Sequence, residues 1–200
     1  MINIEKYNFS FTSTALRVTE LEKVIKHLFF NEELDITNNL GNGNTSTGKK
    51  VLFDLKKRTE HLDLEIIQLF INSDYQTQKN IAYISICKAY GFIRDFVIEV
   101  LREKFLVFDY NITEGDFITF YRRKSELHPE METLTLDTQY KIKQITFKIL
   151  EQSGIIDSVK TKNIQPQLLN NKLISTITMD DRQWLKIFFI SDTDIENIKI

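Results

Sequence analysis

The chain has 200 residues, of which 42% are hydrophobic and 27% are charged, and its formal net charge is −2. These values are typical of a globular protein with a hydrophobic core, and they exclude collagen-like, linker-rich and uniformly basic chains. The single cysteine, Cys87, excludes a disulfide framework and a metal cluster of several cysteines. Residues 1–10 are polar, and no apolar run approaches the roughly 20 residues of a membrane span. We therefore expect a cytoplasmic protein without membrane contact.

Hydrophobic residues at helical spacing dominate the first 150 positions. Thr19 and Glu22 have the spacing of a capping box, which predicts that a helix begins there. A polar loop over residues 37–47 follows. After it we expect a second helix over residues 46–59, capped by a hydroxyl side chain of residues 45–47.

Asp63 is expected to cap a short third helix, and Asp74 starts a longer apolar stretch that is interrupted near Gly91. Beyond Gly91, apolar residues recur at the spacing of the most amphipathic helix in the chain. Its apolar positions are Ile93, Phe96, Val97, Val100, Leu101 and Phe105. On its polar side Glu99 is spaced to pair with Arg102, which indicates a charged face that pairs with itself.

Two further helices are expected before residue 155. Thr113 and Asp116 have the capping-box spacing, ahead of a helix that ends at His128–Pro129. A last long helix runs from Asp137 to a glycine stop at Gly154.

The pattern changes after this glycine. Residues 155–164 are compatible with a short β-hairpin, Pro166 suits the first turn of another helix, and the β-prone residues 184–190 could add a strand. A helix followed by a small hairpin is the outline of a winged helix-turn-helix.

We therefore predict a mainly α, compact helical protein with a small winged-helix-like β-hairpin in its C-terminal part. Residues 1–200 are expected to form a single compact unit. Its sub-blocks would be a helical part over residues 1–108 and the winged-helix-like part over residues 109–200.

The helix expected after the polar loop concentrates positive charge. Its cations are Lys49, Lys50, Lys56, Lys57 and Arg58. Their charge of +5 is reduced to +4 by Asp54. Steps of seven residues place Lys49 in line with Lys56, and Lys50 in line with Lys57. Such a stripe beside a helix N-terminus can bind phosphates, and the alternative interpretation is a solvated face without a ligand.

Two more basic groups are candidates for DNA contact. They are Arg122, Arg123 and Lys124 at the end of one helix, and Lys141, Lys143 and Lys148 on the next. In a winged helix the second group would lie where a recognition helix meets the groove. The alternative is that cations at a helix end stabilise the helix dipole and that the surface lysines only confer solubility.

Residues 43–50 almost fit the phosphate-binding loop G-x-x-x-x-G-K-[ST]. However, Lys50 occupies the position of the hydroxyl that binds Mg²⁺, and residues 36–40 are too polar to form the buried strand that precedes such a loop. We therefore expect a loop that caps the next helix, and no nucleotide.

The sequence contains no recognisable catalytic constellation. His27, His61 and His128 lack a partner at the i+3 or i+4 spacing of a helical metal site. Cys87 lies on an apolar stretch and is expected to be a small buried hydrophobe. The sequence thus predicts no enzyme, no catalytic residues, no metal, no cofactor and no small-molecule substrate.

One stretch carries a family resemblance. Residues 90–106 (YGFIRDFVIEVLREKFL), followed by Asp109-Tyr110 and Ile112-Thr113, resemble the signature of the BrxA family of small proteins encoded in BREX phage-defence operons. Further matching segments are Tyr7–Phe11, Thr12 to Leu16, Thr45–Lys50, Asp116–Phe120 and Phe188–Asp192. The resemblance covers most of the chain and is most specific over residues 90–113.

The resemblance implies a compact, mainly helical cytoplasmic protein that binds DNA and acts beside other BREX components, including a methyltransferase and ATPases. It implies no catalytic residues. Our main hypothesis is a non-enzymatic accessory protein that contacts the phosphates of double-stranded DNA through its basic helix face. The alternative hypothesis is a scaffold that assembles other BREX proteins without touching DNA.

Overall fold

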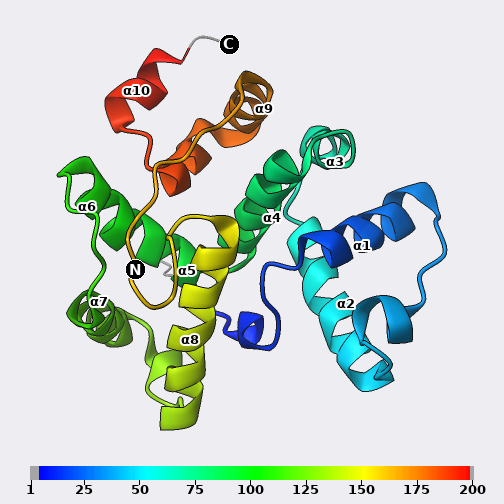
Figure 1. The fold of residues 1–200 in the computed structure, drawn as a ribbon. Helices are drawn as coiled ribbons and strands as arrows, with labels where there is room; N and C mark the ends of the chain where they lie inside the picture. Colours follow the sequence, from blue (N-terminus) through cyan, green and yellow to red (C-terminus); the bar gives the residue numbers. More distant parts are fainter. Residues whose placement is uncertain (1–4, 199–200) are drawn as a thin grey trace.

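The structure, a computed structural model, describes residues 5–198 and is mainly helical (Figure 1). The α-helices are α1 (Val18–Phe30), α2 (Thr45–Thr59), α3 (Leu64–Ile71), α4 (Tyr75–Ala89), α5 (Gly91–Phe96), α6 (Glu103–Leu106), α7 (Glu114–Leu127), α8 (Leu136–Ser153), α9 (Asn171–Asp181) and α10 (Asp192–Asn197). The short 3₁₀ helices are η1 (Ser10–Ser13), η4 (Pro129–Met131) and η5 (Arg182–Phe188). The π-helical turns are η2 (Ile36–Leu40) and η3 (Val97–Arg102).

Helix α4 lies at the centre of this arrangement and packs against α1, α2, α3, α5, α8 and η5 (Figure 1). The run Ile81–Cys87 is buried at every position, so the middle of α4 has no polar, solvated face. A helix that is buried all round is typical of a protein core. The core continues into α5, where the ring centroid of Phe92 lies 5.3 Å from that of Phe120, and the ring centroid of Phe96 lies 5.3 Å from that of Phe117.

Several helix boundaries confirm the sequence prediction. Asp74 accepts a hydrogen bond from the Thr77 amide at 2.8 Å, as expected of the residue that caps α4. Thr113 and Asp116 form the predicted capping box of α7. Gly154 ends α8 in the left-handed conformation at φ +79°, which glycine adopts without strain.

Other helix starts differ from the prediction. α1 begins one residue before Thr19, after Arg17 in the left-handed conformation, so no capping box forms there. Asp63 precedes α3 but its side chain makes no capping hydrogen bond, and Thr135 rather than Asp137 caps α8. Several residues near a helix start can satisfy the same free amides, so residue type alone resolves the boundary only to one or two positions.

The helix predicted beyond Gly91 is α5, η3 and α6 joined end to end, with its apolar positions facing the core. The predicted pairing of Glu99 with Arg102 is wrong. Glu99 instead lies within 2.6 Å of Arg123 and of Lys124 on α7. Arg102 is buried and donates to the Ile190 carbonyl, because the C-terminal segment packs against this helix.

The winged-helix-like hairpin is not supported. The part of the chain that the structure describes contains no β-strand, and only isolated bridges join Ile156 to Ile164 and Asn111 to Asn163. The Asp157 carboxylate closes the intervening turn by accepting from the Asn163 amide at 2.9 Å. Asn111 then pairs with Asn163 from outside this segment, so the chain does not extend into a two-stranded wing.

The expected strand over residues 184–190 is also wrong, because most of this segment belongs to η5. Leu185 and Ile187 are fully buried in η5, which packs against α4 and α9. Pro166 lies in a segment without regular secondary structure, and the next helix begins only after Asn170, whose side chain caps α9. Periodicity cannot distinguish a short buried strand from a short buried helix, which explains the wrong strand prediction over residues 184–190.

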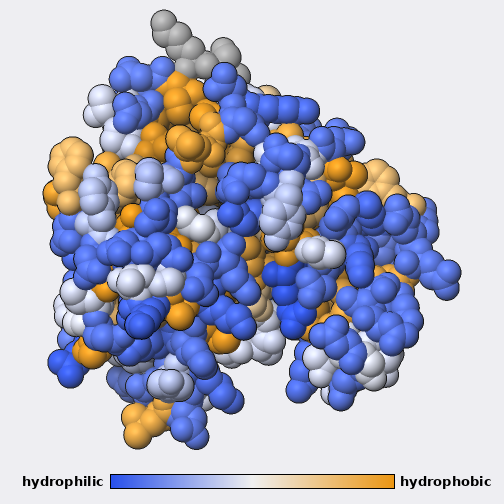
Figure 2. Space-filling view, viewed as in Figure 1, coloured by the Kyte–Doolittle hydropathy of each residue, from blue (hydrophilic) through white to orange (hydrophobic). Residues whose placement is uncertain are grey.

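Polar residues cover most of the molecular face shown in Figure 2. The lower right lobe, which contains η2 and the start of α2, is almost entirely hydrophilic on this face. None of the described helices combines the length and the hydropathy needed to cross a bilayer.

Candidate nucleic-acid interface

The start of α2 is held by a side-chain cap and by a close backbone contact. Asn44 Oδ1 accepts a hydrogen bond from the Thr47 amide at 2.9 Å, so the cap is one residue earlier than predicted. η2 packs directly on the first turns of α2. A Cβ atom on Gly48 would lie 2.2 Å from the Ile36 carbonyl oxygen, so only glycine permits this approach.

The segment with the spacing of a phosphate loop is therefore a helix start. Gly48 lies inside α2, and its amide donates to the Asn44 carbonyl at 2.9 Å. That amide is used within the helix and does not face a phosphate site. Lys49 and Lys50 follow on the exposed side of α2.

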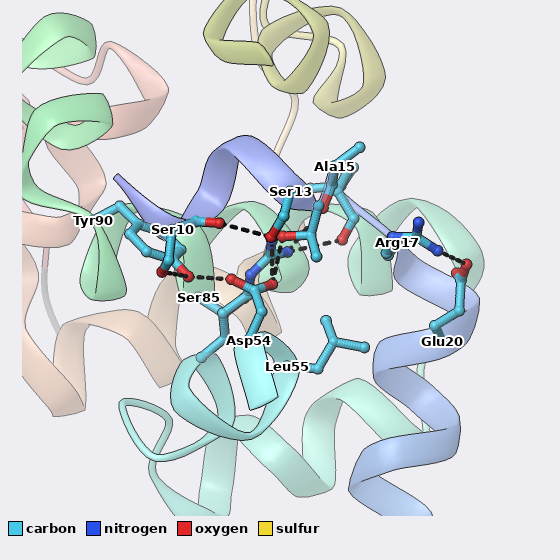
Figure 3. A network of polar contacts seen from close by, with 12 residues as sticks. Ser10, Ser13, Ala15, Arg17, Glu20, Asp54, Leu55, Ser85 and Tyr90 are labelled. Atoms are coloured by element: carbon cyan, nitrogen blue, oxygen red, sulfur yellow. Dashed lines mark hydrogen bonds and ion pairs between the residues drawn. The ribbon is translucent and has the colours of Figure 1, made fainter. Parts of the chain in front are cut away.

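The buried side of α2 carries an internal ion pair (Figure 3). Arg58 Nη2 lies 2.6 Å from Asp54 Oδ2, and Arg58 Nη1 donates to the Ala15 carbonyl at 3.0 Å. The Thr14 hydroxyl donates to Asp54 at 2.7 Å, and the Tyr90 hydroxyl donates to the second carboxylate oxygen. Figure 3 shows Asp54, Ala15 and Tyr90 converging from α2, the N-terminal segment and the end of α4. The pair thus joins three parts of the chain.

This burial changes the composition of the predicted basic stripe. Arg58 is fully buried and faces Asp54, so the two opposite charges offset each other inside the protein. The four lysines of α2 remain, with Lys49 and Lys50 exposed and Lys56 and Lys57 half-buried. Within residues 5–198 no carboxylate lies close enough to pair with any of them.

Lys57 forms the edge of the stripe nearest the core. Its ammonium nitrogen lies 4.6 Å from the centroid of the Tyr90 ring, within range of a cation–π interaction. Burial lowers the pKa of Lys57. The exposed Glu60 follows the last turn of α2, whereas residues 45–52 contain no carboxylate and the helix dipole adds positive charge at that end.

One aromatic side chain stands in the middle of these lysines. Phe53 is 71% exposed, and within α2 no other large apolar side chain is exposed. It follows Lys49 by four residues and Lys50 by three, and it precedes Lys56 by three and Lys57 by four, which makes all four its neighbours on the helix surface. Sequence reasoning overlooked Phe53, although the helical spacing of 3.6 already placed it opposite the buried apolar residues.

The predicted basic group at the end of α7 is largely paired with carboxylates. Lys124 is buried, with its ammonium nitrogen 2.9 Å from Asp95 and 2.6 Å from Glu99. Arg123 lies 2.6 Å from Glu99. These contacts attach α7 to α5 and η3, so both cations have a structural role.

The remaining predicted cations lie in and beside a groove between α7 and α8. Arg122, Tyr140 and Lys143 line this groove, which has a volume of about 610 Å³. Lys143 is paired with Glu114. Three exposed cations in this region, Arg122, Lys141 and Lys148, have no ion-pair partner in the described part of the chain. α7 and α2 lie on opposite sides of α8 in Figure 1.

Cys87 and the candidate metal-binding side chains do not form a reactive site in the described part of the chain. Cys87 is fully buried, and burial raises the pKa of its thiol to about 12, which keeps it protonated and unreactive at neutral pH. No three His, Cys, Asp or Glu side chains among the described residues are arranged to hold a metal ion.

A mainly helical fold that carries four lysines on α2, unpaired within the described residues, in a chain whose net charge is −2, defines a helical protein with a local basic face. The chain belongs to the BrxA family, because the sequence profile described as BrxA matches residues 5–181. A BREX protein BrxA from Bacillus cereus (strain H3081.97) is 28% identical over 185 residues, which cover 88% of this chain and 92% of the relative.

The fold also has a solved counterpart. The crystal structure of an uncharacterized protein from Magnetospirillum magneticum superposes with a TM-score of 0.77 at 15% identity, covering 92% of this chain and 98% of that one. The resemblance inferred from residues 90–113 is thus confirmed at the level of the family. Family membership assigns the chain an accessory role in a BREX phage-defence system.

Proposed function

We propose that this BrxA-family protein is a non-enzymatic, DNA-binding accessory component of a BREX system that works beside other BREX proteins in the cytoplasm. It contacts the phosphates of double-stranded DNA through the lysines of α2 and tolerates many sequences, since phosphate contacts carry no base information.

The observation that carries the proposal is the lack of carboxylate partners around four neighbouring lysines. Among the described residues, Arg102, Lys104, Lys124 and Lys143 are all paired, whereas the lysines of α2 are not. Arg122, Lys141 and Lys148 are also unpaired within residues 5–198 but are divided between α7 and α8, whereas the four lysines share one helix. Unpaired cations on one helix face retain their attraction for an external polyanion. Their position beside the N-terminus of α2 adds the favourable end of the helix dipole.

The test is the fluorescence anisotropy of a labelled duplex with the full chain over a salt series. Each phosphate contact releases counterions, so four contacts predict a log–log slope of affinity against salt of about −3.6. A flat salt response would contradict phosphate binding. The affinity is expected to be modest, because the whole protein has a net charge of −2.

Two matched sets of variants locate the contact. In the first set, Lys49, Lys50, Lys56 and Lys57 are replaced by Ala, which we expect to abolish most of the salt-dependent affinity. In the second set, Arg122, Lys141 and Lys148 are replaced by Ala, and we expect little change. The reverse result would move the interface to the groove between α7 and α8. Lys49, Lys50 and all three residues of the second set are exposed, whereas Lys56 and Lys57 are half-buried, so circular dichroism of each variant checks that the fold is retained.

The scaffold hypothesis makes a different prediction for the same protein. If the chain only assembles other BREX proteins, it will not bind the duplex even at low salt but will co-purify with a BREX partner. Duplex binding that the first variant set abolishes would leave the DNA-binding proposal as the simpler account.

A further inference from the structure

The exposed Phe53 ring has no structural role that its environment explains. The apolar face of α2, with Val51 and Leu55, is already buried against the core. Phe53 projects from the opposite face with 71% of its surface accessible. Single exposed apolar side chains are common on soluble proteins, so exposure by itself does not distinguish Phe53. Its position among four unpaired lysines on one helix face does, and this position indicates a contact surface.

Its surroundings favour a nucleic acid over a lipid. Lysines lie three and four residues away on both sides, so an anionic backbone that follows them passes over the ring. Aromatic rings interleaved with cations are the arrangement by which proteins hold single strands: the cations contact phosphates and the ring stacks on a base. A membrane-binding helix instead presents a broad apolar face, and α2 buries the one that it has.

We propose that Phe53 is a stacking platform for an unpaired base, and that the α2 face therefore prefers single-stranded or locally opened DNA to an intact duplex. This inference rests on the proposed DNA-binding function and specifies its substrate. In a closed duplex the bases are stacked on one another, so the ring reaches a base face only where a step is opened at a cost in unstacking. An already unpaired base avoids that cost.

The experiment compares three labelled probes at one salt concentration. They are a 20-nucleotide oligo(dT), a strand of equal length in which most bases are replaced by abasic sites, and a 20-base-pair duplex. We expect the wild-type full chain to bind oligo(dT) more tightly than the other two. Phe53→Ala should weaken oligo(dT) binding roughly 5- to 100-fold, the usual effect of removing one stacked aromatic ring, and should leave the affinity for the abasic strand unchanged.

Two further variants keep the test specific. Phe53→Trp should retain the affinity, and its added fluorescence, measured against the wild-type protein, should be quenched by oligo(dT) but not by the abasic strand. Tyr140→Ala is the matched control, because Tyr140 is 64% exposed and lies on α8 next to Lys141. Loss of oligo(dT) affinity in Tyr140→Ala but not in Phe53→Ala would overturn the proposal.

The outcomes distinguish a failure of base stacking by Phe53 from a failure of duplex binding by the α2 lysines. If the lysine variants lose duplex binding while Phe53→Ala leaves every probe unchanged, the protein binds phosphates but does not stack bases, and this inference is wrong. If the duplex is not bound but oligo(dT) binds in a Phe53-dependent way, the inference holds and the duplex proposal fails. Phe53-dependent binding to anionic phospholipid vesicles, without any effect on oligo(dT), would also overturn the inference.

Discussion

Asp54 and Arg58 form an ion pair that is buried almost completely in the protein interior. Moving two charges out of water is costly, and their attraction offsets that cost only when the remaining donors and acceptors are also satisfied. Here Thr14 and Tyr90 donate to the carboxylate, and the carbonyls of Ala15 and Leu16 accept from the guanidinium, so that only Arg58 Nε lacks a hydrogen-bond partner in this group. Removing one member would leave the other charge buried without its counter-ion.

We therefore expect Arg58→Met to lower the free energy of unfolding by about 3–5 kcal/mol, measured by urea denaturation. Lys50→Met, on the exposed side of α2, should change it by less than about 0.5 kcal/mol. The double variant Asp54→Leu with Arg58→Met should be more stable than Arg58→Met alone. If the single and double variants lose equal stability, the ion pair is not the cause.

Asp95 is a second residue whose charge matters for folding. Burial alone would raise the pKa of this carboxyl, but a hydrogen bond from Tyr7 at 2.6 Å and the ammonium of Lys124 at 2.9 Å outweigh it, with Arg94 adding to them. The pKa of Asp95 is therefore below its usual value. A lowered pKa stabilises the fold fully above the unfolded-state pKa of about 3.9 and loses this contribution as the pH falls toward the folded-state value.

Asp95→Asn should consequently reduce stability at pH 7, and the difference from the wild-type protein should shrink as the pH falls from 5 to 3. The measurement is the urea midpoint at each pH. Glu126→Gln, which removes an exposed carboxylate on α7, is the control and should show a small difference at every pH. A difference between Asp95→Asn and wild type that stays constant with pH would contradict the assignment.

At the scale of the elements, the contact of η2 with α2 sets the position of the basic face. Gly48 is inside a helix, where alanine normally stabilises by up to about 1 kcal/mol. Here the added Cβ would lie 2.2 Å from the carbonyl oxygen of Ile36, and backbone atoms cannot move aside as a flexible side chain would. The close approach therefore reverses the usual effect of the substitution.

Gly48→Ala should thus destabilise the protein by about 1–3 kcal/mol, the usual cost of overpacking. Gly115 provides the comparison, because it lies in the first turn of α7 and its added Cβ meets only the Thr113 hydroxyl at 3.5 Å. Gly115→Ala should leave the stability unchanged or raise it by up to about 1 kcal/mol. Thermal unfolding of both variants tests the pair, and equal effects would refute the role of η2.

At the scale of the whole molecule, aromatic contacts join the two predicted sub-blocks. The ring centroid of Phe96 lies 5.9 Å from that of Phe147, and the ring centroid of Tyr83 lies 5.6 Å from that of Phe188. The buried apolar residues form one cluster that includes both blocks. We therefore propose that the chain unfolds as a single unit and not as separate parts over residues 1–108 and 109–200.

The only tryptophan of the chain, Trp184, allows single-unit unfolding to be tested without an added fluorescent label. Trp184 lies in η5, near Lys88 of α4, so its fluorescence reports on the C-terminal part, whereas circular dichroism reports on all helices. The two signals should follow the same urea transition. If the fluorescence changes at a clearly lower urea concentration than the helical signal, the C-terminal part unfolds on its own.

The sequence alone determined the features that depend on neighbouring residues. Helical periodicity and the capping pairs located most of the helices, and the stretch over residues 90–113 identified the family. The spacing of the four α2 lysines placed them on a common side of α2 because helix geometry is local. Phe53 could have been found from the same spacing.

The tertiary structure decided which charges face solvent. Arg58 and Lys124 belong to basic runs in the sequence, yet the partners that bury them, Thr14, Tyr90 and Asp95, come from distant segments. The strand expected over residues 184–190 failed for the same reason, because packing against α4 and α9 selects the 3₁₀ helix η5 for apolar residues that also suit a strand. Asp54 is only four residues from Arg58, so this pair is local, but its burial and the core contacts depend on how remote segments meet, and no local pattern contains that information.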